Sequence, residues 1–202
     1  MSDSPPEPRP AGAGADAEPA GHPLLRRLTE RFGAAVLSTH DFRGDATAIV
    51  DRGALLDVCR FLRDDPGTAF ELLVDVTAVD YFGRKPRFEV VYHLYSIEKN
   101  HRLRIKVPLE EGDPSIASLV SVWPGADWLE RETFDMYGVR FEGHPNLKRI
   151  YLYEQFEGHP LRKDYPKEKR QPLIGPGAVH RDPLNDDLTP VRAPGAPSTR
   201  GE

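Results

Sequence analysis

Residues 130–164 contain most of the side chains that could do chemistry. Glu132 and Asp135 stand three residues apart, so a helix would place both carboxylates on one face beside Trp128. Carboxylates held close together separate their pKa values and can act as an acid/base pair. The alternative is a charge network that fixes the helix and the following loop, because an unpaired buried carboxylate is costly. We favour this network, with partners among Arg131, Arg140, His144, Lys148 and Arg149.

The sequence Phe-Glu-Gly-His-Pro occurs twice, at 141–145 and at 156–160. Each copy places Gly and Pro around a histidine, which suits a sharp turn that projects one imidazole. His144 and His159, together with Asp164 or Glu157, could bind a divalent metal and support a metal-dependent hydrolase. No helical His-x-x-x-His spacing and no cysteine pattern accompanies them. Hydrogen bonding within the turns is therefore the simpler role for these histidines.

Apolar spacing predicts the elements that must position these residues. Helices are expected at 24–32, 55–62, 116–123 and 127–138, the last capped by Asp127 and ended by Gly138. Strands are expected at 46–50, 70–80, 87–97 and 101–109, with the last three as an antiparallel meander that has one apolar face. This order predicts an α+β fold with a mixed or antiparallel sheet of about four strands, covered by helices and followed by an extended C-terminal tail.

The composition divides the 202 residues into three parts. Residues 1–23 are rich in Pro, Gly and Ala and are expected to form a disordered arm. Residues 24–165 carry the apolar periodicity of one domain. Residues 166–202 have only scattered aliphatic side chains among Pro and Gly, so we expect this tail to become ordered on partner subunits.

Charge and cysteine content exclude several classes of function. The net charge of -5 argues against nucleic acid as a partner. The one cysteine, Cys59, lies on the apolar face of a predicted helix, where we expect an inert thiol, and it cannot hold an iron-sulfur cluster alone. No glycine-rich phosphate loop is present, and neither a membrane span nor a secretory signal is evident. Any membrane association is expected to occur through partners only.

The segment 130–166 resembles a known family. The runs that carry the resemblance are Glu130-Arg131-Glu132, Asp135-Met136-Tyr137-Gly138, Gly143-His144-Pro145, Leu147-Lys148-Arg149-Ile150 and Gly158-His159-Pro160-Leu161-Arg162-Lys163-Asp164-Tyr165-Pro166. Together they closely resemble the signature of the hydrophilic C subunit of respiratory complex I, the proton-pumping NADH-quinone oxidoreductase. The order of elements expected in 24–129 is compatible with the α+β domain of that family.

The resemblance implies a non-catalytic subunit of the peripheral arm, on the cytoplasmic face of a bacterial cell membrane. Its partners would be the subunits that carry the terminal cluster and the quinone pocket. The chain would hold no cofactor; FMN and the iron-sulfur clusters would lie in partner subunits and carry electrons from NADH to quinone. The matching positions are expected to be structural and interface residues: Glu130, Arg131, Glu132, Asp135, Tyr137, Gly138, Gly143, His144, Pro145, Arg149, Gly158, His159, Pro160, Arg162, Lys163 and Asp164.

One alternative keeps this scaffold role and changes the assembly. Related membrane hydrogenases and ferredoxin- or deazaflavin-linked quinone reductases have similar subunits. The sequence of one chain does not separate these assemblies, whereas the subunits that purify with it would.

Overall fold

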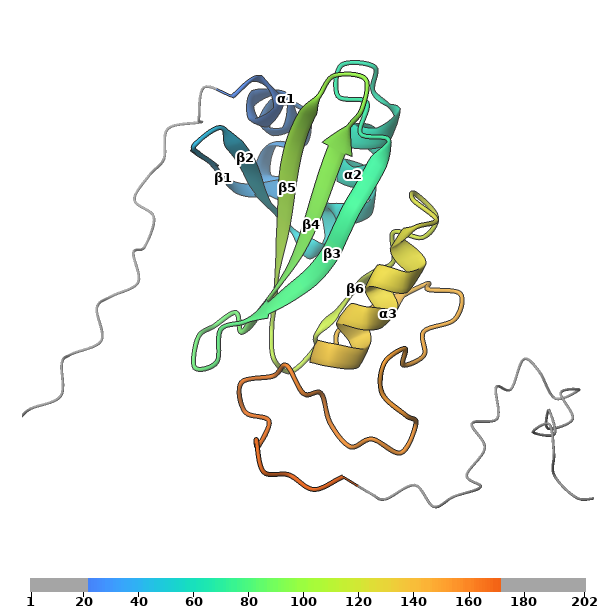
Figure 1. Cartoon of the computed structure of the whole chain (residues 1–202). Helices are drawn as coiled ribbons and strands as arrows, with labels where there is room; N and C mark the ends of the chain where they lie inside the picture. Colours follow the sequence, from blue (N-terminus) through green and yellow to red (C-terminus); the bar gives the residue numbers. More distant parts are fainter. Residues whose placement is uncertain (1–21, 172–202) are drawn as a thin grey trace, which may run out of the picture. The chain divides into compact units, whose positions relative to one another are not determined.

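The computed structural model describes residues 22–171, which form an α+β fold on a mixed five-stranded sheet (Figure 1). Its strands run in the spatial order β1 (Val36–Phe42), β2 (Asp45–Val50), β5 (His101–Leu109), β4 (Phe88–Ser96) and β3 (Leu72–Asp80). Neighbouring strands are antiparallel except for β2 and β5, which are parallel. The predicted fold class and the β3–β4–β5 meander are confirmed. Most of the predicted arm and tail lies outside the described residues.

Two helices pack on one face of this sheet, α1 (Pro23–Phe32) and α2 (Leu55–Asp64) (Figure 1). Helix α1 begins at Pro23, within the expected arm, because the fixed φ of proline suits the first helical turn. Short 3₁₀ turns, Gly33–Ala35 and Arg52–Ala54, lead into β1 and α2. None of the helices within residues 22–171 is long and apolar enough to cross a membrane.

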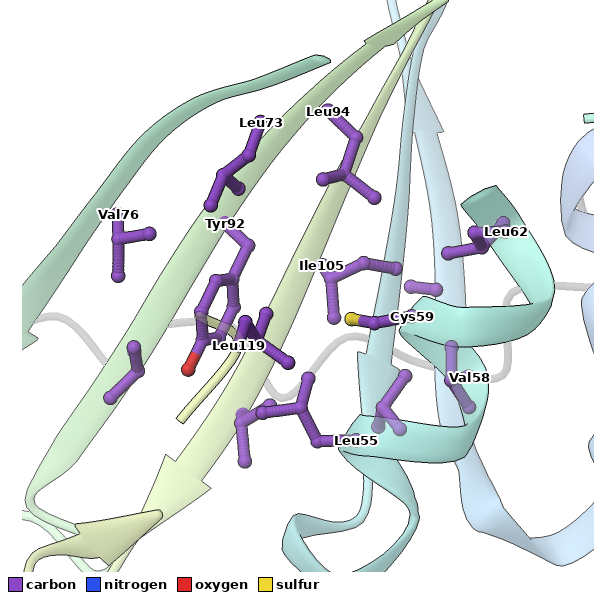
Figure 2. Close-up of a cluster of buried hydrophobic side chains, with 14 of the residues drawn as sticks. Leu55, Val58, Cys59, Leu62, Leu73, Val76, Tyr92, Leu94, Ile105 and Leu119 are labelled. Carbon is purple, nitrogen blue, oxygen red and sulfur yellow. The ribbon is translucent and has the colours of Figure 1, made fainter. Parts of the chain in front are cut away.

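The core lies between these helices and the sheet. Figure 2 shows the apolar face of α2, with Leu55 and Cys59, turned toward Tyr92 of β4 and Ile105 of β5. All four side chains are fully buried, and the burial of Leu55 and of Ile105 each stabilises the fold by roughly 1.5–3 kcal/mol. The predicted packing of Cys59 is confirmed, and burial also raises the pKa of its thiol, as expected for an inert cysteine.

Strand β1 is an element that the sequence pattern does not predict. It lies at the edge of the sheet, pairs with β2 alone, and contains a bulge between Val36 and Ser38, so its sequence lacks a clean alternation of apolar and polar residues. The connection to β2 is the pair Arg43 and Gly44, both with positive φ (56° and 86°), as a tight hairpin turn requires. The sheet therefore has one strand more than the four expected.

The helix expected at 116–123 is absent. The chain instead forms β6 (Ser115–Ala117), which pairs in parallel with β7 (Arg140–Glu142), and then a turn. Ile116 and Trp123 are buried, as their spacing suggests. The N–H of Ser118, however, donates to the carbonyl of Glu142 rather than to a helical partner, so the prediction of a helix is wrong.

Helix α3 (Ala126–Tyr137) follows and lies along β3. The hydroxyl of Thr133 donates to the carbonyl of Val76 at 2.9 Å, which fixes α3 to this strand. The prediction of Asp127 as the N-cap is wrong, because the cap position is Gly125 and Asp127 lies in the first turn, where its charge still complements the helix dipole. The end at Gly138 is confirmed, with φ 75° and ψ 25°.

Candidate functional site

Asp135 organises the loop that follows α3. Its side chain is fully buried, and one oxygen, Oδ1, accepts a hydrogen bond from Nη1 of Arg149 at 2.7 Å. The other oxygen, Oδ2, accepts from the backbone N–H groups of Ile150, Tyr151 and Leu152 at 2.9–3.1 Å. Burial alone would raise the pKa of Asp135, but these four hydrogen bonds hold it below its ordinary value. The carboxylate is therefore ionised and fully used within the chain.

Two arginines bind the backbone of the same loop. Arg149 donates through Nη2 to the carbonyls of Phe156 and Gly158, both at 3.1 Å. Arg131, on α3, donates to the carbonyls of Lys148 and Arg149 at 3.1 and 3.2 Å. One arginine from the helix and one from the loop therefore hold the loop backbone in place.

The C-terminal end of α3 is covered by the next part of the loop. The carbonyls of residues 135–137 have no partner within the helix, as expected for a last turn. They accept hydrogen bonds, in order, from Nδ1–H of His159, N–H of Leu161 and Nε–H of Arg162. Burial lowers the pKa values of His159 and Arg162. Arg162 remains a cation at the negative end of the helix dipole, where a positive charge is stabilising.

We call this unit the α3 clamp and define it as α3 with residues 144–164. Gly138 is the point at which the helix and the loop approach most closely. A Cβ at this position would lie 2.5 Å from Nη2 of Arg162 and 2.6 Å from the ring of His159, on a backbone with positive φ. Only glycine meets both conditions without strain. Gly138 therefore ends the helix and also leaves room for the side chains of His159 and Arg162.

A second charge cluster fixes the far end of the clamp. Arg87, which is 2% exposed, forms a two-pronged ion pair with Asp80 (both contacts 2.9 Å) and bonds Asp164 at 2.7 Å and Glu111. Asp80 also accepts from the N–H of Lys163 at 2.8 Å. The Arg87 guanidinium lowers the pKa values of Asp80 and Asp164. This cluster ties the loop to the β3–β4 hairpin.

Sequence reasoning missed Asp80 and Arg87 as site residues. They are opposite charges at the two ends of a short hairpin loop, and this spacing is the one signal that the sequence contains. Asp164 is among the predicted residues, but its partner is 77 positions earlier in the chain. No local pattern identifies a pair of that separation.

Glu130 is a buried carboxylate without a cationic partner in the described part of the chain. Its oxygens accept from Oγ of Ser118 at 2.6 Å and from the N–H of Leu119 at 2.7 Å. Burial raises the pKa of Glu130 to about 7. This side chain ties the turn after β6 to α3.

The acid/base pair considered for Glu132 and Asp135 does not form. Asp135 is buried under the loop, whereas Glu132 is exposed, as is Trp128 at 64%. Three residues span about 300° of helix, so the two carboxylates point about 60° apart, and the loop covers only the Asp135 side. The predicted charge network is confirmed for Asp135 with Arg149.

The two Phe-Glu-Gly-His-Pro turns each place a histidine on a carbonyl of α3. His144, between Gly143 and Pro145, lies with Nε2 3.2 Å from the carbonyl of Asp127, and its Nδ1 accepts from the N–H of Asn146. The second turn, at 156–160, places His159 between Gly158 and Pro160 on the carbonyl of Asp135. The predicted hydrogen bonding in these turns is confirmed.

The structure does not bring together the residues of the metal site considered for these histidines. Eight residues separate the carbonyls of Asp127 and Asp135, which is about 12 Å along a helix, far beyond what one metal ion bridges. Asp164 is paired with Arg87 instead. Residues 22–171 contain no group of three or more His, Cys, Asp or Glu side chains that could hold a metal.

Comparison with known proteins assigns the chain to the same family that residues 130–166 resemble. A family model described as "Respiratory-chain NADH dehydrogenase, 30 Kd subunit" matches residues 48–171, which include the whole clamp. A curated relative, the C subunit of NADH-quinone oxidoreductase from Roseiflexus sp. (strain RS-1), is 51% identical over 143 residues. That alignment covers 71% of this chain and 82% of the relative.

Solved structures share the fold. A trypsin-resistant fragment of Nqo5 matches with a TM-score of 0.53 and 29% identity, over 61% of this chain and 98% of that one. A chain of the membrane-bound sulfane sulfur reductase, an archaeal respiratory membrane complex, matches with a TM-score of 0.61 over 72% of this chain and 85% of that one; at 23% identity this shows the fold alone. The chain belongs to the 30 Kd subunit family of the respiratory-chain NADH dehydrogenase, whose curated relatives are named as the C subunit of NADH-quinone oxidoreductase.

Proposed function

We propose that this chain is a non-catalytic subunit of the peripheral arm of a proton-translocating NADH-quinone oxidoreductase. One observation supports the structural role most directly. The carboxylate of Asp135, a fully buried acid of the clamp, accepts four hydrogen bonds from within the chain. A group bound in this way fixes a shape and has no lone pair directed at a substrate.

The electron path in this proposal lies in other subunits. FMN and the iron-sulfur clusters belong to partners, and this chain packs beside the subunits that carry the terminal cluster and the quinone pocket. The clamp residues, including Glu130, Tyr137 and Lys163, serve assembly. The chain associates with the cytoplasmic face of the membrane through these partners.

The proposal also gives a role to the ends of the chain. The folded domain of the subunit begins at Pro23, the first residue of α1, and residues 166–202 dock on partner subunits.

Native electrophoresis of membranes from cells that express the chain tests this proposal. Probed with an antibody to the chain, the gel should show it in a very large assembly that also stains for NADH oxidation. If the chain occurs only as a free species of its own size, the proposal is rejected.

A second candidate is the equivalent subunit of another membrane respiratory complex, such as a membrane hydrogenase or a ferredoxin- or deazaflavin-linked quinone reductase. The shared fold of the sulfane sulfur reductase chain is the observation that favours it. Mass spectrometry of the co-purifying subunits separates the two candidates. A flavin-containing, NADH-oxidising module supports the first, and its replacement by a different electron-input module supports the second.

A further inference from the structure

The outer surface of the α3 clamp carries two large aromatic side chains. Trp128 on α3 is 64% exposed and Tyr151 on the loop is 66% exposed. Asp135, which binds the N–H of Tyr151, is seven residues after Trp128, so it lies on nearly the same helix face two turns later. Trp128 and the backbone of Tyr151 therefore follow one line along the clamp.

Arg131 joins these two aromatic positions. Its guanidinium lies 5.4 Å from the centre of the Trp128 ring and donates to the carbonyls of Lys148 and Arg149, two residues before Tyr151. The contacts hold the guanidinium in place, and the four hydrogen bonds of Asp135 hold the loop backbone. A surface whose groups are already ordered loses little conformational entropy when it binds a partner.

The composition of this surface is that of a binding hot spot. Trp, Tyr and Arg are the residues most enriched where truncation to alanine costs most affinity. Trp and Tyr supply a large contact area with only two rotatable side-chain bonds.

On the side of Trp128 away from Arg131, the exposed charge is negative. Glu132 is exposed one turn after Trp128, and its carboxylate makes no ion pair or hydrogen bond within residues 22–171. An exposed carboxylate attracts a cation, whereas the Trp128 ring already has the Arg131 guanidinium beside it. Glu132 therefore favours a partner with a Lys or Arg at this place.

We propose that Trp128, Tyr151 and Glu132 form a docking site for a segment of a neighbouring subunit that presents an apolar side chain next to a Lys or Arg. The apolar side chain contacts the aromatic rings, and the cation faces Glu132. This inference rests on the proposed function, since it names the chemistry of a partner in the same assembly.

Substitutions in a strain that carries the variant chain as its only copy test the site. Trp128→Ala and Tyr151→Ala should each lower the amount of chain retained in the NADH-oxidising assembly by at least about tenfold during native electrophoresis. Glu132→Lys should lower it more than Glu132→Gln, because reversal adds repulsion to the lost attraction. Phe42→Ala is the matched control, since Phe42 is also 64% exposed but lies on β1; it should leave retention unchanged.

Thermal unfolding of the purified variants separates docking from folding. Each should melt within about 2 °C of the unsubstituted chain, because exposed side chains contribute little to stability. A photoreactive p-benzoylphenylalanine in place of Trp128 should cross-link to a partner peptide that has Lys or Arg near the modified residue.

The outcomes distinguish this inference from the proposed function. If the Trp128→Ala chain is retained as well as the unsubstituted chain, or if the cross-linked peptide has no basic residue, the docking site is wrong and the subunit role stands. If the unsubstituted chain itself is absent from the NADH-oxidising assembly, both proposals fail.

Discussion

At the scale of single residues, Asp135 and Glu130 occupy the same helix in opposite electrostatic settings. Asp135 has a guanidinium and three backbone N–H groups as donors. Glu130 has a hydroxyl and one N–H. Both are buried, yet the pKa of Asp135 is lowered whereas that of Glu130 is raised to about 7. The number and charge of the hydrogen-bond donors determine whether the pKa is raised or lowered.

Asp135→Ala should destabilise the purified chain by roughly 3–5 kcal/mol, because it leaves the charge of Arg149 and three amides without their acceptor. Urea unfolding measures the loss. Glu132→Ala is the matched control on the same helix; its exposed carboxylate should contribute less than about 0.5 kcal/mol. Equal effects of the two substitutions would contradict the role given to Asp135.

Glu130 should make stability fall as pH rises. Between the ordinary pKa of 4.5 and the folded value of about 7, the folded chain binds a proton that the unfolded chain has released. The free energy of unfolding should therefore decrease across this range by on the order of 3 kcal/mol, and show no further change from this group above it.

The variant Glu130→Gln isolates this effect. His40, His93 and His159 have lowered pKa values and contribute slopes of the opposite sign, but these are common to both proteins. The difference in urea midpoint between the variant and the unsubstituted chain should therefore grow from pH 5 to pH 8, in favour of the glutamine. A constant difference would show that Glu130 titrates normally.

At the scale of elements, the end of α3 couples a helix stop to the packing of a loop. Gly138→Ala should cost about 1–2 kcal/mol for the left-handed backbone and a further amount for the displacement of His159 and Arg162. Gly143→Ala provides the control: Gly143 also has positive φ, but a Cβ there meets nothing within 4 Å.

Unfolding free energies of these two glycine variants give the packing contribution by difference. The Gly138 variant should be the less stable of the two. Equal losses would mean that the loop adjusts freely to the added methyl group.

Local sequence patterns predict the elements that have long apolar runs. They fail where contacts between residues far apart in the sequence determine the conformation. Helices α1 and α2, strands β3–β5 and the stop at Gly138 follow from periodicity and breakers that lie within each segment. The segment 115–123 has helical spacing, but β7 and Glu130 bind its amides. Strand β1, at the edge of the sheet, is held in an extended conformation by its pairing with β2.

The same distinction holds for the candidate site. The doubled turn predicts two hydrogen-bonding histidines, and the charge-network hypothesis identifies Arg149 as a partner of Asp135. The Arg87 cluster joins residues 80, 87, 111 and 164, and no pattern within a short window relates them. These four residues meet only in the folded chain.

At the scale of the whole molecule, the clamp is anchored at both ends. The Asp135 cluster holds residues 149–152 on α3, and the Arg87 cluster holds residues 163 and 164 on the β3–β4 hairpin. A long loop with little regular structure is thereby fixed on the sheet and the helix. We infer that this fixed loop provides a surface that other chains of the assembly can recognise.

The most direct test measures two quantities in cells whose only copy carries Asp135→Ala or Arg131→Ala: the amount of assembled complex, and NADH:quinone turnover per assembled complex. Phe42→Ala, on the distant β1, serves as the control. We predict that the amount falls severalfold for both clamp variants while turnover per complex is unchanged. A normal amount of complex with abolished turnover would contradict the structural role and give the clamp a direct part in catalysis.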